Sequence, residues 1–286
     1  MITLPAGTFT MGSTDGSDDE QPVLPIRIET FALDRSPVTV AQFRQFVLRT
    51  GHATTAEKFG DSAVFFMERG RWQMVSGAQW RYPMGPDEAA AQPDHPVTQV
   101  SWSDAQAYCQ AQDKRLVTEA EWEYAARNAS SSAARYGFGD QIVRDGVFLA
   151  NVFSGRFPFA NDGADGYRYT SPVGAYGTTP LGLTDMAGNV WEWVADWYAP
   201  YSKRALALAA EGGAFSEKVQ RGGSFLCAAE VCHGYRTTAR GHSTPDSSHV
   251  HVGFRCARDL AASAAPGAKS AAVQPRPIDP AAPAQG

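Results

Sequence analysis

The chain has 286 residues, with 25 Lys and Arg against 30 Asp and Glu, and 43% of its residues are hydrophobic. This length suffices for one large domain with a sizeable core or for two small ones. The net charge of −5 is spread without long blocks of one sign, which argues against a nucleic-acid-binding surface. No window approaches the roughly 20 apolar residues of a membrane span, and the first residues do not resemble a signal peptide. We therefore expect a cytoplasmic protein with neither nucleic acid nor membrane as a partner.

Glycine and proline are abundant, with 27 and 18 residues, as are the large aromatic side chains, with 7 Trp, 10 Tyr and 15 Phe. Many turns pinned by aromatic rings indicate a loop-rich fold with short elements. Residues 261–286 are almost entirely Ala, Pro, Gly and Ser and cannot bury enough apolar surface to order. We predict a single irregular α+β domain over residues 1–260 and a disordered tail over residues 261–286.

Helix signals come first along the chain. Thr39 with Gln42, and Thr118 with Glu121, form capping boxes at the start of apolar periodic runs. Gly51 follows the last turn of the first run, where a left-handed residue usually ends a helix. We expect helices over three segments: 40–50, 103–112 and 119–127.

Strand signals are shorter and weaker. Residues 23–30 alternate around Ile26 and Ile28, and residues 220–225 and 252–257 flank a cysteine-rich region. Between 130 and 220 almost every stretch is interrupted by Gly, Pro, Asn or Asp. The pattern fits an α+β domain better than a βαβ sheet, and the sequence has no nucleotide-binding or serine-hydrolase motif.

The chain's cysteines are too few for a disulfide scaffold, but two of them are close together. Cys227 and Cys232 are separated by four residues, and four histidines follow within twenty residues: His233, His242, His249 and His251. Four interpretations remain open from spacing alone: two buried thiols, a local disulfide, a zinc site, or a soft-metal or redox site that favours Cu(I).

The same segment resembles the formylglycine-generating enzymes, or sulfatase-modifying factors. The matching stretches near the cysteine pair are GGS before Cys227, Arg236 and Arg240 after it, TPDSS at 244–248 and GFRC at 253–256. The resemblance extends over residues 1–258 through LPAGTFTMGS, AEKFGDS, PDHPVTQVSW, KRLVTEAEWEYAAR and GNVWEW. It implies the family's irregular domain, which belongs to the C-type-lectin-like superfamily.

The resemblance also implies an activity. Enzymes of this family oxidise the cysteine of a Cys-x-Pro-x-Arg stretch in an unfolded sulfatase to Cα-formylglycine with O2. Cys227 and Cys232 would hold Cu(I) as a two-thiolate site that accepts the substrate thiolate as a third ligand. A hydrogen is then removed from the substrate Cβ, and the thioaldehyde that results is hydrolysed. Ser224 matches an active-site serine, Trp191 would wall an O2 pocket, and Arg240 would stabilise developing negative charge.

Two structural calcium sites follow from the same resemblance. Oxygen ligands spread over Gly-rich loops suit Ca2+, although such residues also make ordinary turns. The first site would use the side chains of Asn151 and Asp165 and the carbonyls of Val152 and Tyr167. The second would use the side chains of Asp185 and Glu192 and the carbonyls of Gly188 and Val190.

Other implied roles are less tightly specified. Cys109 and Cys256 match a pair that is disulfide-bonded in secretory relatives, whereas a cytoplasmic location argues against that bond, and we expect both to be structural. Asp61 is the candidate partner for the substrate arginine. His251 stands where the family usually has Asn, so it is a further candidate substrate-binding residue, with His249 an unusual neighbour.

The expected function is therefore that of a copper-dependent, monomeric formylglycine-generating oxidase. One alternative is an oxidase of this type that acts on a different peptidyl or small thiol. Its only support is that Val231 stands where the family usually has Tyr, and His251 where it usually has Asn. Another alternative is a non-catalytic calcium-bearing binding module. Iron-dependent sulfoxide synthases share the superfamily but carry a further N-terminal domain, whereas this sequence begins directly in the LPAG motif.

Overall fold

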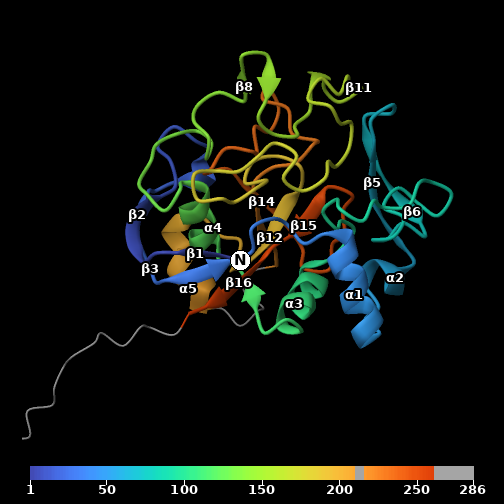
Figure 1. The fold of residues 1–286 in the computed structure, drawn as a ribbon, viewed down its shortest axis with the longest axis horizontal. Helices are drawn as coiled ribbons and strands as arrows, with labels where there is room; N and C mark the ends of the chain where they lie inside the picture. Colours follow the sequence, from blue (N-terminus) through green and yellow to red (C-terminus); the bar gives the residue numbers. More distant parts are fainter. Residues whose placement is uncertain (210–215, 261–286) are drawn as a thin grey trace, which may run out of the picture.

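The computed structural model describes residues 1–209 and 216–260, so the tail expected at 261–286 lies outside the described residues. Two small sheets occupy its centre (Figure 1). The first is antiparallel, with the order β1 (Ile2–Leu4), β4 (Phe31–Leu33), β16 (Cys256–Asp259) and β7 (Arg115–Leu116). The second has the order β14 (Arg240–Ser243), β13 (Lys218–Arg221), β12 (Trp191–Trp197) and β15 (Val252–Phe254), with β12 and β15 parallel.

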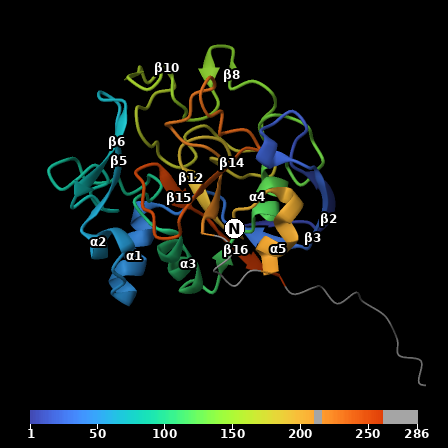
Figure 2. The same cartoon turned by 180° about the vertical axis from the view of Figure 1, so that it is seen from behind.

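Hairpins extend from this centre. The β2–β3 hairpin lies on the side of α4, and the β5–β6 hairpin lies on the opposite side with α1 and α2 (Figures 1 and 2). The paired strands are β2 (Gly7–Met11) with β3 (Leu24–Ile28), β5 (Asp61–Phe66) with β6 (Arg71–Ser76), β8 (Val143–Arg144) with β9 (Val147–Phe148), and β10 (Gly155–Arg156) with β11 (Ala160–Asn161).

The helices follow their local capping signals. Thr39 and Gln42 form the predicted capping box of α1, and Gly51 ends it in the left-handed conformation with φ 68°. The third predicted helix is confirmed as α4, capped by Thr118, and the second, α3, begins and ends slightly earlier than predicted. The helical segments are α1 (Val40–Thr50), α2 (Thr55–Phe59), α3 (Trp102–Gln110), α4 (Glu119–Ala126), α5 (Arg204–Ala209) and the 3-10 turns η1 (Asp18–Glu20) and η2 (Tyr201–Lys203).

Two strand predictions need correction. The strand predicted at 220–225 ends at Arg221, because Gly222 and Gly223 take φ values of 95° and 69° that turn the chain out of the sheet. The strand predicted at 252–257 is two strands, β15 and β16, which belong to different sheets and are separated by Arg255. The fold class itself, a loop-rich α+β domain, is confirmed.

A network of buried ion pairs joins α4 to the second sheet. Arg221 of β13 contacts both Glu119 and Glu123 of α4, and all three side chains are at most 2% exposed. On the other face of this region Arg255 forms two hydrogen bonds of 2.7 Å with the carboxylate of Glu192, and both side chains are fully buried. These pairs satisfy charges that would otherwise be costly to bury, so they fix the helix and sheet relative to each other.

Cys109 of α3 and Cys256 of β16 form a disulfide in the structure. The bond joins residues 147 positions apart, and both cysteines are fully buried. The sequence left open whether Cys109 and Cys256 are bonded to each other, and in the structure they are.

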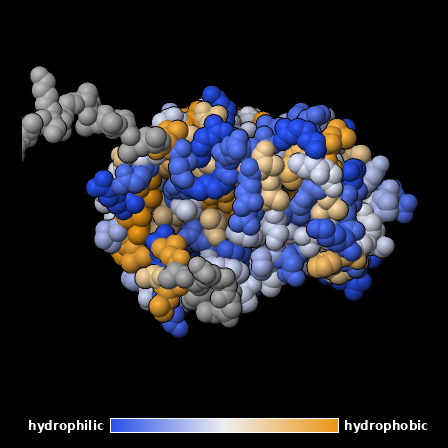
Figure 3. Space-filling model, turned by 90° about the horizontal axis from the view of Figure 1, so that it is seen from below, coloured by the Kyte–Doolittle hydropathy of each residue, from blue (hydrophilic) through white to orange (hydrophobic). Residues whose placement is uncertain are grey.

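On the face shown in Figure 3, hydrophobic residues gather mainly at the left end, and hydrophilic residues cover most of the rest. Within residues 1–209 and 216–260, no helix combines the length and the apolar character needed to cross a bilayer.

Candidate active site

The cysteine pair lies on a loop that leaves the second sheet at Arg221. Gly223 allows the two arms of this loop to pack together, since a Cβ there would lie 2.5 Å from the backbone nitrogen of Tyr235. Backbone hydrogen bonds then shape the loop: the N–H of Cys227 donates to the carbonyl of Ser224, and the N–H of Cys232 donates to that of Ala228. The local turn therefore brings the two cysteines of the C-x4-C motif to one place.

Both thiols are free, and they differ sharply in environment. Cys227 is buried, whereas Cys232 is exposed. Burial and the neighbouring Cys232 raise the pKa of the Cys227 thiol well above its usual range. A hydrogen bond from Cys227 lowers the pKa of Cys232 to about 7. The pair thus presents one protonated inner thiol and one outer thiol that ionises near neutral pH, as reactive cysteines do.

Ser224 and Trp191 both lie near Cys227. The hydroxyl of Ser224, which is fully buried, lies 4.0 Å from the Sγ of Cys227. Gly234 separates Cys227 from Trp191: a Cβ on Gly234 would lie 2.4 Å from Cζ2 of the indole and 3.1 Å from Sγ of Cys227. The structure therefore places Trp191 and Cys227 on the two sides of Gly234, with Ser224 near Cys227.

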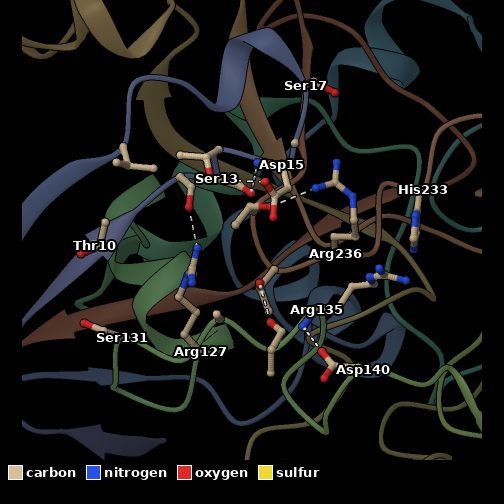
Figure 4. A pocket seen from close by; sticks show the side chains of 18 of the residues that line it. Thr10, Ser13, Asp15, Ser17, Arg127, Ser131, Arg135, Asp140, His233 and Arg236 are labelled. Carbon is tan, nitrogen blue, oxygen red and sulfur yellow. Dashed lines mark hydrogen bonds between the residues drawn. The ribbon is translucent and has the colours of Figure 1, made fainter.

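A cavity of about 830 Å3 opens beside Cys232. Figure 4 shows its walls, which come from the loop after β2, from the segment after α4 and from the cysteine loop. Polar side chains dominate: Ser13, Thr14, Asp15, Ser17, Arg127, Ser131, Arg135, Asp140, His233, Arg236, Thr237 and Thr238. The outer thiol is thus accessible from a large hydrophilic space.

His233, directly after Cys232, was not assigned a role from the sequence. Its backbone takes a left-handed φ of 40°, its Nε2 lies 2.7 Å from the hydroxyl of Tyr136, and its ring packs against Tyr235 with centroids 4.9 Å apart. A non-glycine residue with positive φ is uncommon and needs support from its surroundings. The aromatic neighbours supply that support and fix the turn that carries Cys232.

Arg240, the predicted charge-stabilising residue, lies at the carboxylate of Glu119. Its Nε donates to Glu119 at 2.7 Å, and its Nη1 donates to the carbonyls of Asp19 and Ala199. Its guanidinium also stacks on Tyr201 and does not line the cavity at Cys232. Arg240 is therefore a member of the buried ion-pair network, and its role in stabilising charge on the substrate stays a prediction.

The two predicted substrate-binding residues lie on the side of the β5–β6 hairpin. Asp61 lines a second hollow of about 290 Å3 together with His249, whereas Cys232 lines the larger cavity. His249 and His251 face each other with ring centroids 5.8 Å apart, and both pack against Trp72 of β6, which sequence reasoning missed. The Nδ1 atoms of both histidines are buried without a hydrogen-bond partner.

Burial explains the protonation of these two imidazoles. It lowers the pKa of His249 to about 4 and, together with the neighbouring His249, that of His251 well below its usual range. The pair is therefore neutral at pH 7. The part of the chain that the structure describes contains no group of three or more His, Cys, Asp or Glu side chains placed to hold a metal.

The first predicted calcium site fits the residues present. The Oδ1 atom of Asn151 is buried without a partner, so it is an acceptor that a cation would satisfy. The carboxylate of Asp165 is held nearby by the backbone N–H groups of Val152 and Tyr167, at 2.8 and 3.0 Å. Burial raises the pKa of Asp165, as expected for a carboxylate that lacks a counter-ion.

The second predicted calcium site does not fit in this arrangement. The Glu192 carboxylate is fully engaged by Arg255 and by the indole nitrogen of Trp122. The Asp185 carboxylate accepts hydrogen bonds from Gly174, Thr184 and Asn189. A divalent cation on Glu192 would have to share the carboxylate with a buried guanidinium, so Glu192 acts as an ion-pair partner of the framework. The carbonyls of Gly188 and Val190 then lack the carboxylate that would complete this site.

The cysteine pair fits Cu(I) by its donor set. Two adjacent thiols, one buried and one already acidic, are soft ligands that suit a d10 ion of low coordination number. A structural zinc site would need further ligands, and the described residues offer none in range.

The protein is thus a loop-rich domain of mixed helices and strands with a free thiol pair beside a polar cavity. The family model for the "Sulfatase-modifying factor enzyme 1-like domain" matches residues 1–260, and the chain belongs to this family.

Individual relatives agree with that assignment. The chain is 43% identical over 279 residues to the formylglycine-generating enzyme of Streptomyces coelicolor, covering 90% of this chain and 88% of that protein. It is 37% identical to the "Inactive C-alpha-formylglycine-generating enzyme 2" of Bos taurus, covering 90% and 87%. Among solved structures, PvdO from Pseudomonas aeruginosa superposes with a TM-score of 0.68 at 26% identity, covering 90% and 93%. Since the family includes a member named inactive, activity has to be argued from the site.

Proposed function

We propose that the protein is a formylglycine-generating oxidase that converts the cysteine of a Cys-x-Pro-x-Arg segment in an unfolded sulfatase to Cα-formylglycine. The observation that carries the proposal is the pair of free, hydrogen-bonded thiols of Cys227 and Cys232, one buried and one open to a cavity. A binding module has no need for such a pair, and the family name and the Streptomyces relative both point to the same chemistry.

Four residues around the thiol pair would have different roles in the reaction. Cys232 presents an ionisable thiol at the surface, where an extended peptide can bring its cysteine. Cys227 donates a hydrogen bond to it from the interior. The Trp191 indole, which packs against Gly234 beside Cys227, would shield the inner side of the thiols from bulk water. The Ser224 hydroxyl lies 4.0 Å from the Sγ of Cys227 and would donate a hydrogen bond there.

The two cysteines would hold Cu(I), which supplies a thiophilic centre able to bind the substrate thiolate and to react with O2. Asn151 and Asp165 would hold a structural calcium ion, which ties together two loops with little apolar packing.

Substrate selection would fall to the second hollow. Asp61 would offer a carboxylate to the arginine of the peptide, and the neutral His249 would form part of the wall of the same hollow, with His251 packed behind it. The exposed Trp72 provides an apolar surface next to them.

Mass spectrometry of a Cys-x-Pro-x-Arg peptide tests the proposal. The peptide is incubated aerobically with Cu(I)-loaded protein and a thiol reductant, and the expected product has lost hydrogen sulfide and gained one oxygen atom at the cysteine. Cys227→Ser and Cys232→Ser should abolish the product, while Glu230→Gln, an exposed residue between them, should leave it unchanged. A peptide that stays unmodified with the wild-type protein, while copper is bound, would exclude the sulfatase substrate.

A further inference from the structure

This inference rests on the proposed reaction, which needs two more electrons than the substrate cysteine supplies. Conversion of R–CH2–SH and O2 to R–CHO, hydrogen sulfide and water breaks the O–O and C–S bonds and forms a C=O bond. Counting atoms, it also consumes two protons and two electrons. Two molecules of a second thiol, R′–SH, supply both when they join as R′–S–S–R′. A co-substrate thiol must therefore reach the site in every turnover.

The cavity at Cys232 is placed and sized for such a molecule. Its volume of about 830 Å3 falls in the range of pockets that hold small ligands. Cys232 and His233 form part of its wall, so the outer thiol is accessible to a ligand in the cavity. Figure 4 shows His233 on this side of the cavity. The hollow with Asp61, which we assign to the peptide, shares no lining residue with this cavity.

The charges of the cavity indicate which thiol it would take. Arg236 is held rigidly by Glu20 and by the hydroxyl of Thr238 at 3.0 Å. Arg135 is anchored through its backbone, whose N–H donates to Asp140 at 2.8 Å. Its side chain is exposed at the cavity and makes no ion pair within residues 1–209 and 216–260. Arg135 is thus an available guanidinium for a carboxylate.

The opposite wall is complementary. Asp15 lies on the loop after β2, and its carboxylate has one long contact of 3.4 Å, with the hydroxyl of Thr14. Hydroxyl groups of Ser13, Ser17 and Ser131 surround the space between. A ligand with a carboxylate at Arg135, an ammonium at Asp15 and a polar body between them would satisfy every one of these groups.

We infer that this cavity is the binding site of the reducing co-substrate, a small hydrophilic thiol that carries both carboxylate and ammonium groups. Arg135 binds its carboxylate, and Asp15 binds its ammonium. Its sulfur approaches Cys232 from the solvent side, while the peptide occupies the hollow with Asp61. The two substrates thus bind their distal charged groups in different hollows, and their sulfurs meet at Cys232.

Binding is tested first, without turnover. S-methylglutathione has the charges of such a thiol but cannot donate electrons. Isothermal titration should show that it binds the wild-type protein and binds Arg135→Gln about tenfold more weakly, the loss of one charged hydrogen-bonded contact. Arg156→Gln, which removes an exposed arginine outside the cavity, should bind like wild type. Equal affinity of all three proteins, or no binding to any, would overturn the inference whether or not the protein is an oxidase.

Kinetics then connect the site to turnover. With glutathione as reductant, Arg135→Gln should raise the KM for glutathione about tenfold and leave the KM for the peptide unchanged. With uncharged dithiothreitol, the same variant should match wild type. A variant that slows both reductants equally, or that changes the peptide KM instead, would contradict the assignment. Absence of peptide conversion even with dithiothreitol would instead count against the proposed function.

Discussion

Two neighbouring regions of this molecule treat their polar groups in opposite ways. In the framework between α4 and the second sheet, Arg221, Arg255 and Arg240 are each paired with a glutamate and are almost completely buried. In the cysteine loop a few residues away, Cys232 is exposed with an acidic thiol, and His233 adopts a left-handed backbone. The charged groups of the framework are buried and paired with one another, whereas the loop leaves the Cys232 thiol exposed to ligands.

This difference between framework and loop shows which of the family's sequence motifs serve the fold and which serve the reaction. EAEWEY supplies Glu119 and Glu123, GNVWEW supplies Glu192, and GFRC supplies Arg255, all of them members of the framework. These motifs therefore identify the fold. Reactive groups occur on the short loop that the framework holds in place, so the two regions should respond differently to substitution.

The largest expected effect is on the framework. Arg255→Met leaves the Glu192 carboxylate buried without its ion-pair partner, and should lower the free energy of unfolding by about 3–5 kcal/mol. Urea denaturation followed by circular dichroism measures this change. Arg156→Met, at an exposed position, should stay within about 0.5 kcal/mol of wild type. A loss under about 1 kcal/mol for Arg255→Met would show that the pair does not hold the sheet.

The loop should lose activity before stability. Gly234→Ala places a methyl group against the Trp191 indole and the sulfur of Cys227. Because misplacing a reacting group by about 1 Å costs on the order of a hundredfold in rate, peptide conversion should fall by about that factor. Glu230→Gln, exposed in the same loop and outside the cavity, serves as the control. Full activity in Gly234→Ala would show that the packing of Trp191 against Gly234 and Cys227 does not matter for the reaction.

The histidine pair should make stability depend on pH. The pKa of His249 is lowered to about 4 and that of His251 is lowered further, so between about pH 6.5 and 4 the unfolded chain binds protons that the folded chain does not. The unfolding free energy should therefore fall on acidification, by about 4 kcal/mol more between pH 7 and 5 than in His249→Gln/His251→Asn, about 2 kcal/mol for each imidazole. Denaturation curves at both pH values measure this difference, and parallel losses in the two proteins would refute it.

The smallest effect concerns the outer thiol alone. Alkylation of Cys232 by iodoacetamide in the metal-free protein should rise with pH to a plateau, with a midpoint near 7, because a hydrogen bond from Cys227 lowers the pKa of Cys232 to about 7. In Cys227→Ala the midpoint should move up towards about 8.5, the ordinary value of a free thiol. An unchanged midpoint would mean that the two thiols do not interact.

The sequence predicted what depends on local signals. The capping boxes at Thr39 and Thr118 located α1 and α4 almost to the residue, since their side-chain caps act within one turn. The C-x4-C motif located the thiol pair for the same reason. β12 was missed because it is buried along most of its length and so lacks the alternation that marks a half-buried strand.

Features that depend on tertiary contacts could not be predicted. The ion pair of Arg240 with Glu119 joins positions 121 residues apart, which no local pattern reveals. The cavity at Cys232 combines three distant segments, around Ser13, Arg135 and Arg236. The contact of Trp72 with His251 likewise depends on how the β5–β6 hairpin packs.

A titration with Cu(I) tests most directly that the cysteine loop is the reactive centre. The metal-free protein is titrated in competition with a colorimetric Cu(I) chelator, alongside Cys227→Ser, Cys232→Ser and the surface variant Arg156→Gln as a neutral control. The account predicts one tightly bound equivalent for wild type and Arg156→Gln, and its loss in each cysteine variant. An equivalent that survives in both cysteine variants would place the metal elsewhere and contradict the assignment of Cys227 and Cys232.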